Sequence, residues 1–169
     1  MSTRGFALAA AVSSLIAAAM TLLPWVSLEE RGLPMRWAGL GFYYGDDIGS
    51  VPAIQPLGWV VVVVALEALT LLGFQLFVPG GTPLAGAARW LFAGLAGLAT
   101  VAAVLMAVAI AVPSLLYGNL FAELAAYAGA DVINEGRDVV AVPTLIGVAF
   151  WLVVTAVVAG LGFVRSSRS

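Results

Sequence analysis

Glu67 is the one ionisable side chain inside a long apolar run of this sequence. It lies in the stretch LGWVVVVVALEALTLLGFQLFV, residues 57–78, which carries no other charge. A helix rises 1.5 Å per residue, so Glu67 would lie about 15 Å from residue 57, near the middle of a bilayer. A charged carboxylate at that depth costs about 3 kcal/mol on insertion scales. The sequence therefore marks Glu67 as a candidate intramembrane site.

Two roles are open for Glu67. It shares a helical face with Thr70 and Gln75, and the three could form a protonatable site in a transport pathway or a polar contact to a partner helix. Alternatively, a neutral Glu67 could bond a hydroxyl of another span, the candidates being Ser13, Ser14, Thr100 and Thr155. A transporter normally shows a second intramembrane charge or a broken span, and the sequence shows neither.

Acidic residues in the two long polar loops are a second kind of candidate. The first loop holds Glu29, Glu30, Asp46 and Asp47, and the second holds Asp131, Glu135 and Asp138. Calcium takes six to eight oxygens from an ordered loop, so neighbouring carboxylates alone are a weak signal. A membrane enzyme acting on lipid through Asp46 and Asp47 is a third interpretation. We expect solvated loops and no metal site.

The residue types that are missing exclude most enzyme chemistry. The chain has no Cys and no His, and it lacks the GxSxG, Walker, HExxH and CxxC motifs. All seven basic residues are Arg, and they are scattered, which does not make a nucleic-acid surface. We therefore predict a protein that is not an enzyme, with no cofactor, no metal and no nucleic-acid partner.

Four apolar runs, one of which contains Glu67, have the length needed to cross a membrane, about 20 helical residues. They cover residues 5–23, 57–78, 90–112 and 144–164, with prolines at most ends. The chain is 63% apolar and 9% charged, whereas soluble domains carry about 25% charged residues. We predict an all-α membrane protein: one domain, residues 1–169, folded as a four-transmembrane-helix bundle with a small external hairpin or loop region.

The first run has a second interpretation, as a cleaved signal peptide. Arg4 precedes it, and Ala17, Ala18 and Ala19 offer a cleavage site. The apolar run continues to Leu23, which favours a retained anchor.

Small residues at every fourth position predict close packing of the spans. They are Ala9, Ser13, Ala17 and Thr21 in the first run, Ala99, Ala103, Ala107 and Ala111 in the third, and Ala156 and Gly160 in the fourth. Alanine is abundant here, so chance spacing is the alternative.

The distribution of Arg predicts the orientation. With four crossings, one side holds Arg4, Arg89, Arg165 and Arg168, and the other holds Arg31, Arg36 and Arg137. We predict a multi-pass protein of the cell membrane with both termini cytoplasmic. Residues 24–56 and 114–143 are then external loops, and 79–89 is a cytoplasmic loop.

Both external loops show structural patterns. Residues 26–29 and 33–37 alternate apolar and polar around Gly32, which predicts a hairpin with Pro34 in an edge strand. In the second loop, Asn119 is a candidate cap for a helix to about Ala128, with Leu120, Phe121, Leu124 and Tyr127 on one face and Glu123 opposite. This helix would lie on the membrane or continue the third span. The aromatic residues of the first loop predict an external contact surface: Trp25, Trp37, Phe42, Tyr43 and Tyr44.

The dipeptide Pro24-Trp25 after the first run, followed by a short strand region and three further runs, resembles a known family. The layout is similar to the tryptophan-associated transmembrane proteins of actinobacteria, small four-helix prokaryotic membrane proteins, and more loosely to claudins. The claudin Cys pair and Gly-Leu-Trp motif are absent. The resemblance implies a fold and no mechanism.

Two functions remain in view. The first is an accessory or interaction subunit of a membrane complex, which contacts the lipid bilayer and either another membrane protein or further copies of itself. The second is a small proton-linked transporter or channel component that uses Glu67.

Overall fold

Four long helices dominate the structure, which is a computed structural model that describes residues 2–46, 54–78, 86–128 and 139–167. Each is long and apolar enough to cross a membrane. They are α1 (Thr3–Met20), α2 (Gly58–Phe77), α3 (Ala87–Ala111) and α5 (Val142–Ser166). The predicted class is confirmed in this coarse form: a mostly helical chain with four helices of spanning length.

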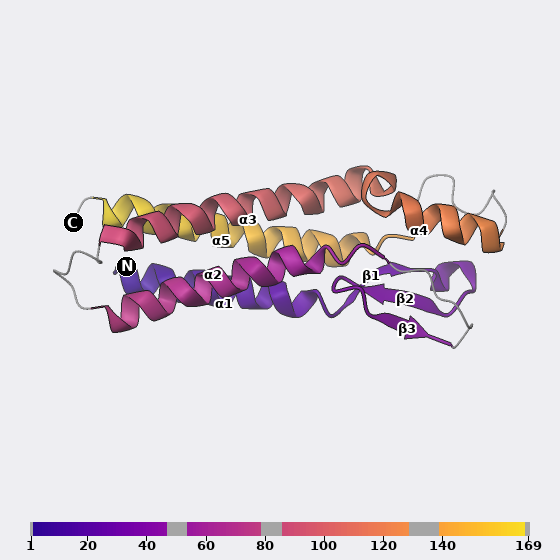
Figure 1. The fold of residues 1–169 in the computed structure, drawn as a ribbon, viewed down its shortest axis with the longest axis horizontal. Helices are drawn as coiled ribbons and strands as arrows, with labels where there is room; N and C mark the ends of the chain where they lie inside the picture. The colour runs from indigo at the N-terminus through magenta and orange to yellow at the C-terminus, as the bar shows by residue number, and fades with distance from the viewer. Residues whose placement is uncertain (1, 47–53, 79–85, 129–138, 168–169) are drawn as a thin grey trace.

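The long helices lie side by side and alternate in direction (Figure 1). Their contacts close a ring of four helices, in which α2 packs on α1, α1 on α5, α5 on α3, and α3 on α2. The contact between α2 and α3 is the least extensive of the four. We call the line where these two helices meet the α2–α3 seam. Both termini lie at one end of the ring, and a small sheet lies at the other.

The helix bounds differ from the predicted runs by one to three residues at each end. The first helix stops at Met20, because Thr21 turns the chain and its hydroxyl donates to the Ala18 carbonyl at 2.6 Å. The third begins at Ala87, three residues before the apolar run, and so includes Arg89 in its first turn. Residues 79–85 of the predicted cytoplasmic loop, 79–89, lie outside the described residues.

Close packing through small residues is confirmed for most of the first stripe and only in part for the third helix, where Ala99 is buried. Ser13 and Ala17 of α1 are buried, and so is Thr21 just beyond its end. In α3, however, Ala107 and Ala111 are exposed. That helix buries Phe92, Leu95 and Met106 beside its alanines, and a glycine of α5 leaves room for one of these larger side chains. The Phe92 ring lies over Gly162 of α5, where an added Cβ would overlap it.

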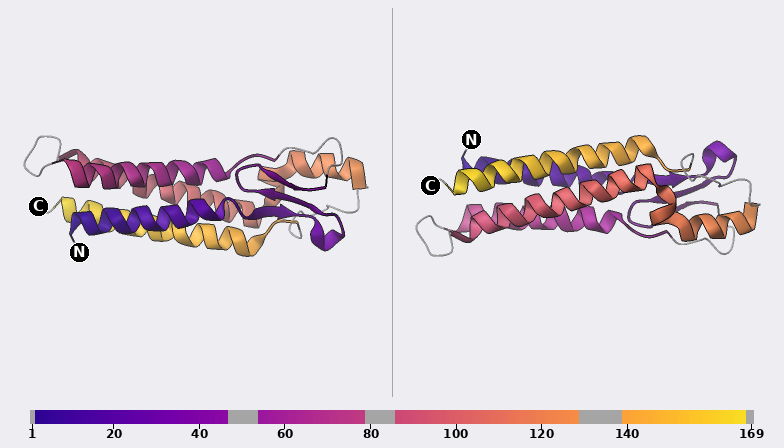
Figure 2. Two further views of the ribbon diagram at one scale, coloured as in Figure 1. Left: turned by 90° about the horizontal axis from the view of Figure 1, so that it is seen from below. Right: turned by 90° about the horizontal axis from the view of Figure 1, so that it is seen from above.

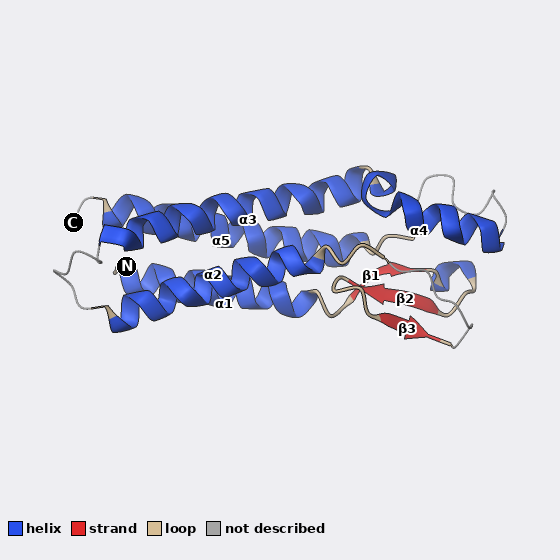
Figure 3. Ribbon diagram, viewed as in Figure 1, coloured by secondary structure: helices blue, strands red, loops and turns tan. Residues whose placement is uncertain are grey.

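The predicted hairpin is part of a three-stranded antiparallel sheet (Figure 3). Its strands are β1 (Pro24–Ser27), β2 (Met35–Ala38) and β3 (Tyr43–Gly45), with a 3-10 turn, η1 (Glu29–Arg31), and Gly32 at φ 77° between the first two. The edge-strand prediction for Pro34 is wrong. The unforeseen β3 makes β2 the central strand, and Pro34, which has no N–H to donate, lies just before it.

The second loop contributes a helix and a further strand-like segment. The helix, α4 (Pro113–Ala128), begins six residues before the predicted cap Asn119, because a proline is tolerated at the first helical position. It lies beyond the end of α3 along the long axis, after a turn of the chain at Val112 that separates the two helices (Figure 2). Further on, the Ser27 amide donates to Val139 at 2.8 Å, which attaches residues 139–141 to the free edge of β1.

Candidate functional site

The Glu67 side chain lies in the α2–α3 seam at the middle of its helix. A Cβ added at Gly94 of α3 would be 2.8 Å from its Oε1 atom. The carboxylate therefore rests against the α3 backbone where that helix has no side chain. Both residues remain partly accessible from outside the ring.

Other seams of the ring place an apolar group in the same relation to a glycine. Phe92 of α3 covers Gly162, and the Met20 side chain of α1 covers Gly147, both on α5. At the α2–α3 seam the group over the glycine is a carboxylate. This is the least extensive of the four contacts, and it holds the one charged side chain from the middle of a span.

The four hydroxyl groups that we considered from the sequence as hydrogen-bond partners of Glu67 all bond to other groups. Ser13 Oγ and Thr155 Oγ1 lie 2.8 Å apart and link α1 to α5. The Ser14 hydroxyl donates to the Ala11 carbonyl, and that of Thr100 donates to the Ala96 carbonyl. The prediction of an internal hydroxyl partner is therefore wrong. No residue in the described ranges donates a hydrogen bond to the Glu67 carboxylate.

The two residues grouped with Glu67 make hydrogen bonds to other groups. The exposed Thr70 hydroxyl donates to the Leu66 carbonyl at 2.8 Å. Gln75 lies eight residues beyond Glu67, about 12 Å along the axis, and its backbone carbonyl accepts from Arg4 Nε at 3.1 Å. The structure places all three on α2 without a hydrogen bond between their side chains in the described part of the chain.

Two members of the predicted external contact surface are buried, and for them the prediction is wrong. Trp25 is 0% exposed: its ring covers Gly39, and its Nε1 donates to the Met20 carbonyl at 3.2 Å. A bulge between Pro24 and Val26 interrupts the strand alternation, so both Trp25 and Val26 point inward. Trp37 is paired with Val26 and is also buried.

The other aromatic residues of that surface differ in exposure. Phe42 is 52% and Tyr44 46% exposed. Tyr43 is half-buried against the Trp37 ring, with centroids 5.4 Å apart, and its hydroxyl donates to the Asp46 carbonyl at 2.9 Å. The outer surface of the sheet therefore presents two large apolar side chains, Phe42 and Tyr44, instead of five.

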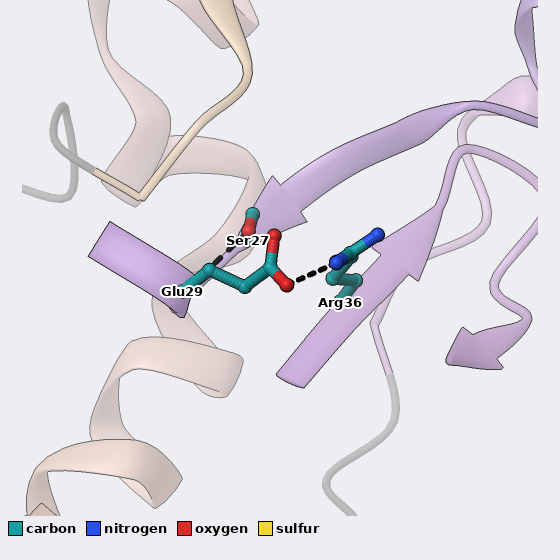
Figure 4. Close-up of polar contacts among 3 residues, drawn as sticks. All are labelled: Ser27, Glu29 and Arg36. Atoms are coloured by element: carbon teal, nitrogen blue, oxygen red, sulfur yellow. Dashed lines mark hydrogen bonds and ion pairs between the residues drawn. The ribbon is translucent and has the colours of Figure 1, made fainter. Parts of the chain in front are cut away.

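The polar face of the sheet carries an ion pair (Figure 4). Ser27, Arg36 and Tyr44 are in register across the three strands, and Arg36 pairs with Glu29. Both side chains are 45% exposed, so the pair contributes about 1 kcal/mol or less. Glu29 thus neutralises a neighbouring cation. The described residues contain no group of three acidic side chains that could hold a metal ion. Four predicted loop acids lie outside them: Asp47, Asp131, Glu135 and Asp138.

Tyr117 of α4 is a buried phenol that sequence reasoning missed. It is 2% exposed and packs against the Phe121 ring, with centroids 6.3 Å apart. Its hydroxyl has no hydrogen-bond partner in the described part of the chain, and burial raises the pKa of Tyr117. The one signal in the sequence was Pro113. Interpreted as the first residue of a helix, and not as the end of a span, it would have placed Tyr117 in that helix.

Comparison with protein families, curated proteins and solved structures gives no match to this chain. The resemblance to the tryptophan-associated transmembrane proteins therefore stays a prediction.

Proposed function

We propose that this protein is a multi-pass protein of the cell membrane that works by binding other membrane components, as a non-enzymatic accessory subunit of a complex. The observation that carries the proposal is the Glu67 carboxylate, which lies at mid-span beside Gly94 with no donor from its own described chain. Charged groups within membranes are almost always paired. A carboxylate that no described residue of the chain pairs points to a partner.

The external unit supports the same proposal. Phe42 and Tyr44 are large side chains that stay about half exposed, whereas Trp25 and Trp37 of the same sheet region are buried. Exposed aromatic residues are enriched at protein interfaces and at the membrane–water boundary. In the orientation we propose, with both termini cytoplasmic, these side chains lie outside the cell.

A small proton-linked transporter or channel component is the second candidate. Its supporting observation is again Glu67, a protonatable group in the least extensive seam. Proton flux into vesicles that hold the purified protein would support it, provided that Glu67→Gln abolishes the flux. Flux that survives this substitution would exclude Glu67 as the carrier.

The experiment that tests the proposed function is mild extraction of a tagged copy from its native membrane, followed by mass spectrometry of what accompanies it. We expect one membrane protein in stoichiometric amount. A chain that is extracted alone, together with measurable flux or turnover by the purified protein, would contradict the proposal.

A further inference from the structure

The outer side of the α2–α3 seam is a shallow surface around Glu67. Helix spacing aligns Glu67 with two exposed residues of α2, and Gly94 with three of α3. We call these the seam face: Val63 and Thr70 from α2, and Trp90, Gly97 and Val101 from α3, with Glu67 and Gly94 at the centre.

Gly97 leaves open space on this face, one turn from the Gly94 that the Glu67 carboxylate covers. Gly94 and Gly97 are one turn apart and exposed, and nothing lies within 4 Å of a Cβ added at Gly97. Helices in lipid associate where small residues allow their backbones to approach closely. The shape of the seam face would accept many different helices, so the Glu67 carboxylate must determine which helix binds.

A second copy of this chain cannot supply the missing charge. Inside the four spans Glu67 is the only ionisable residue, and the Arg residues lie at their ends, as with Arg4, Arg89 and Arg165. Two copies meeting at this face would oppose carboxylate to carboxylate. Charge complementarity therefore requires a helix from a different protein.

We propose that the seam face docks a transmembrane helix of a second membrane protein, and that a Lys or Arg near the middle of that helix pairs with Glu67. This inference rests on the proposed function and names the partner chemistry. A lone cation at mid-membrane is as costly as a lone carboxylate, so the two offset each other's cost only when the helices meet. The pair thus selects its partner against the many apolar helices of the membrane.

The first test uses synthetic helices as probes. One peptide of about 20 apolar residues carries a single central Lys, and its twin carries Leu there. Association with the purified full chain is followed by energy transfer in phosphatidylcholine vesicles. We expect the Lys peptide to bind about tenfold more tightly than its twin, or about 1.4 kcal/mol. Equal binding of the two peptides would overturn the inference.

Two variants locate the effect on the seam face. Glu67→Leu is expected to abolish the preference for Lys. Adding Val153→Glu to that variant restores one carboxylate near the middle of α5, at a residue that is 50% exposed on the helix across the ring from α2. We expect no recovery. Recovery would mean that any carboxylate in the membrane suffices, which would refute a docking site at the seam.

A methyl group added under the carboxylate provides a finer test. Gly94→Ala places its Cβ against Oε1, and the flexible Glu67 side chain must move away. Lys-peptide binding should weaken severalfold. Gly160→Ala is the matched control, because nothing lies within 4 Å of its Cβ and it is on α5. Equal binding by the two variants would count against the seam geometry.

The tagged extraction separates this inference from the proposed function. If the Glu67→Leu chain still co-purifies its native partner in full amount, the docking inference fails and the proposed function stands. If the native chain co-purifies no partner, the proposed function fails with it. The melting temperatures of the Glu67→Leu chain and the native chain are compared first. A Glu67→Leu chain that melts no lower than the native chain and has lost the partner supports the inference.

Discussion

At the residue scale, the Glu67 carboxylate is the one charged group in the middle of a long apolar helix, and it lies over Gly94 of α3. A lone charge in an apolar run can be read directly from the chain. Its position over Gly94 could not be, because that depends on how two separate helices rotate against each other. The same limit explains Ser13 and Thr155, which were offered to Glu67 and instead bond each other.

Replacing the unpaired carboxylate should stabilise the isolated protein. Glu67→Leu removes a polar group that no described residue bonds, so we expect a gain of about 1–3 kcal/mol in the free energy of unfolding. Reversible unfolding in detergent micelles, followed by circular dichroism, measures it. A destabilised variant would show that Glu67 has a partner within its own chain.

The hydroxyl pair between α1 and α5 should contribute measurably to stability. Thr155→Val removes its bond to Ser13 and is expected to cost about 0.6–1.7 kcal/mol. Thr100→Val is the matched control, because both threonines donate to the carbonyl four residues back but only Thr155 also reaches another helix. Equal effects of the two substitutions would argue against the interhelical bond.

Tyr117→Phe should stabilise the protein, because the hydroxyl it removes is buried and no described residue bonds it. We expect a gain of about 1–3 kcal/mol. The raised pKa of Tyr117 also predicts that the free energy of unfolding depends on pH. It is unaffected by this titration below the unfolded pKa of about 10, and it falls as the pH rises above that value, because the unfolded chain then loses the phenol proton more readily. The variant should therefore lose less stability at alkaline pH than the native chain. Parallel declines would contradict this.

At the scale of elements, apolar length predicted the four long helices, and alternation predicted the first two strands. Neither signal could reveal β3, which is only three residues long, or the early start of α4 at Pro113. The length of an apolar run and the period of its apolar residues do not reveal an element of three residues. They also do not show that a proline that follows one helix is the first residue of the next. The inward turn of Trp25 depends on a bulge, which has no period at all.

The sheet and α2 are joined by glycines without room for a side chain. The Gly58 amide donates to the Gly39 carbonyl at 2.8 Å, and a Cβ added at Gly58 would be 2.7 Å from that backbone. Gly58→Ala should therefore cost about 1–3 kcal/mol, as overpacking does. Gly73→Ala, in the same helix with open space around it, should be neutral or stabilising. Thermal unfolding compares the two, and equal melting temperatures would contradict a tight junction.

At the scale of the whole molecule, the polar and apolar parts are separated along one axis. The termini lie at one end, the sheet and α4 at the other, and the apolar helices between them (Figure 1). The docking we propose uses one side of that middle region, at the α2–α3 seam. The rest of the ring would then face lipid, including the exposed residues of α5 across from α2.

Site-specific photo-crosslinking in the native membrane tests this account most directly. A photoreactive residue is placed at Gly97 on the seam face, and, in a second chain, at Val153 on α5. We predict one discrete protein adduct from position 97 and lipid adducts alone from position 153. Lipid adducts alone from both positions, or the same protein adducts from both, would contradict a partner held at the α2–α3 seam.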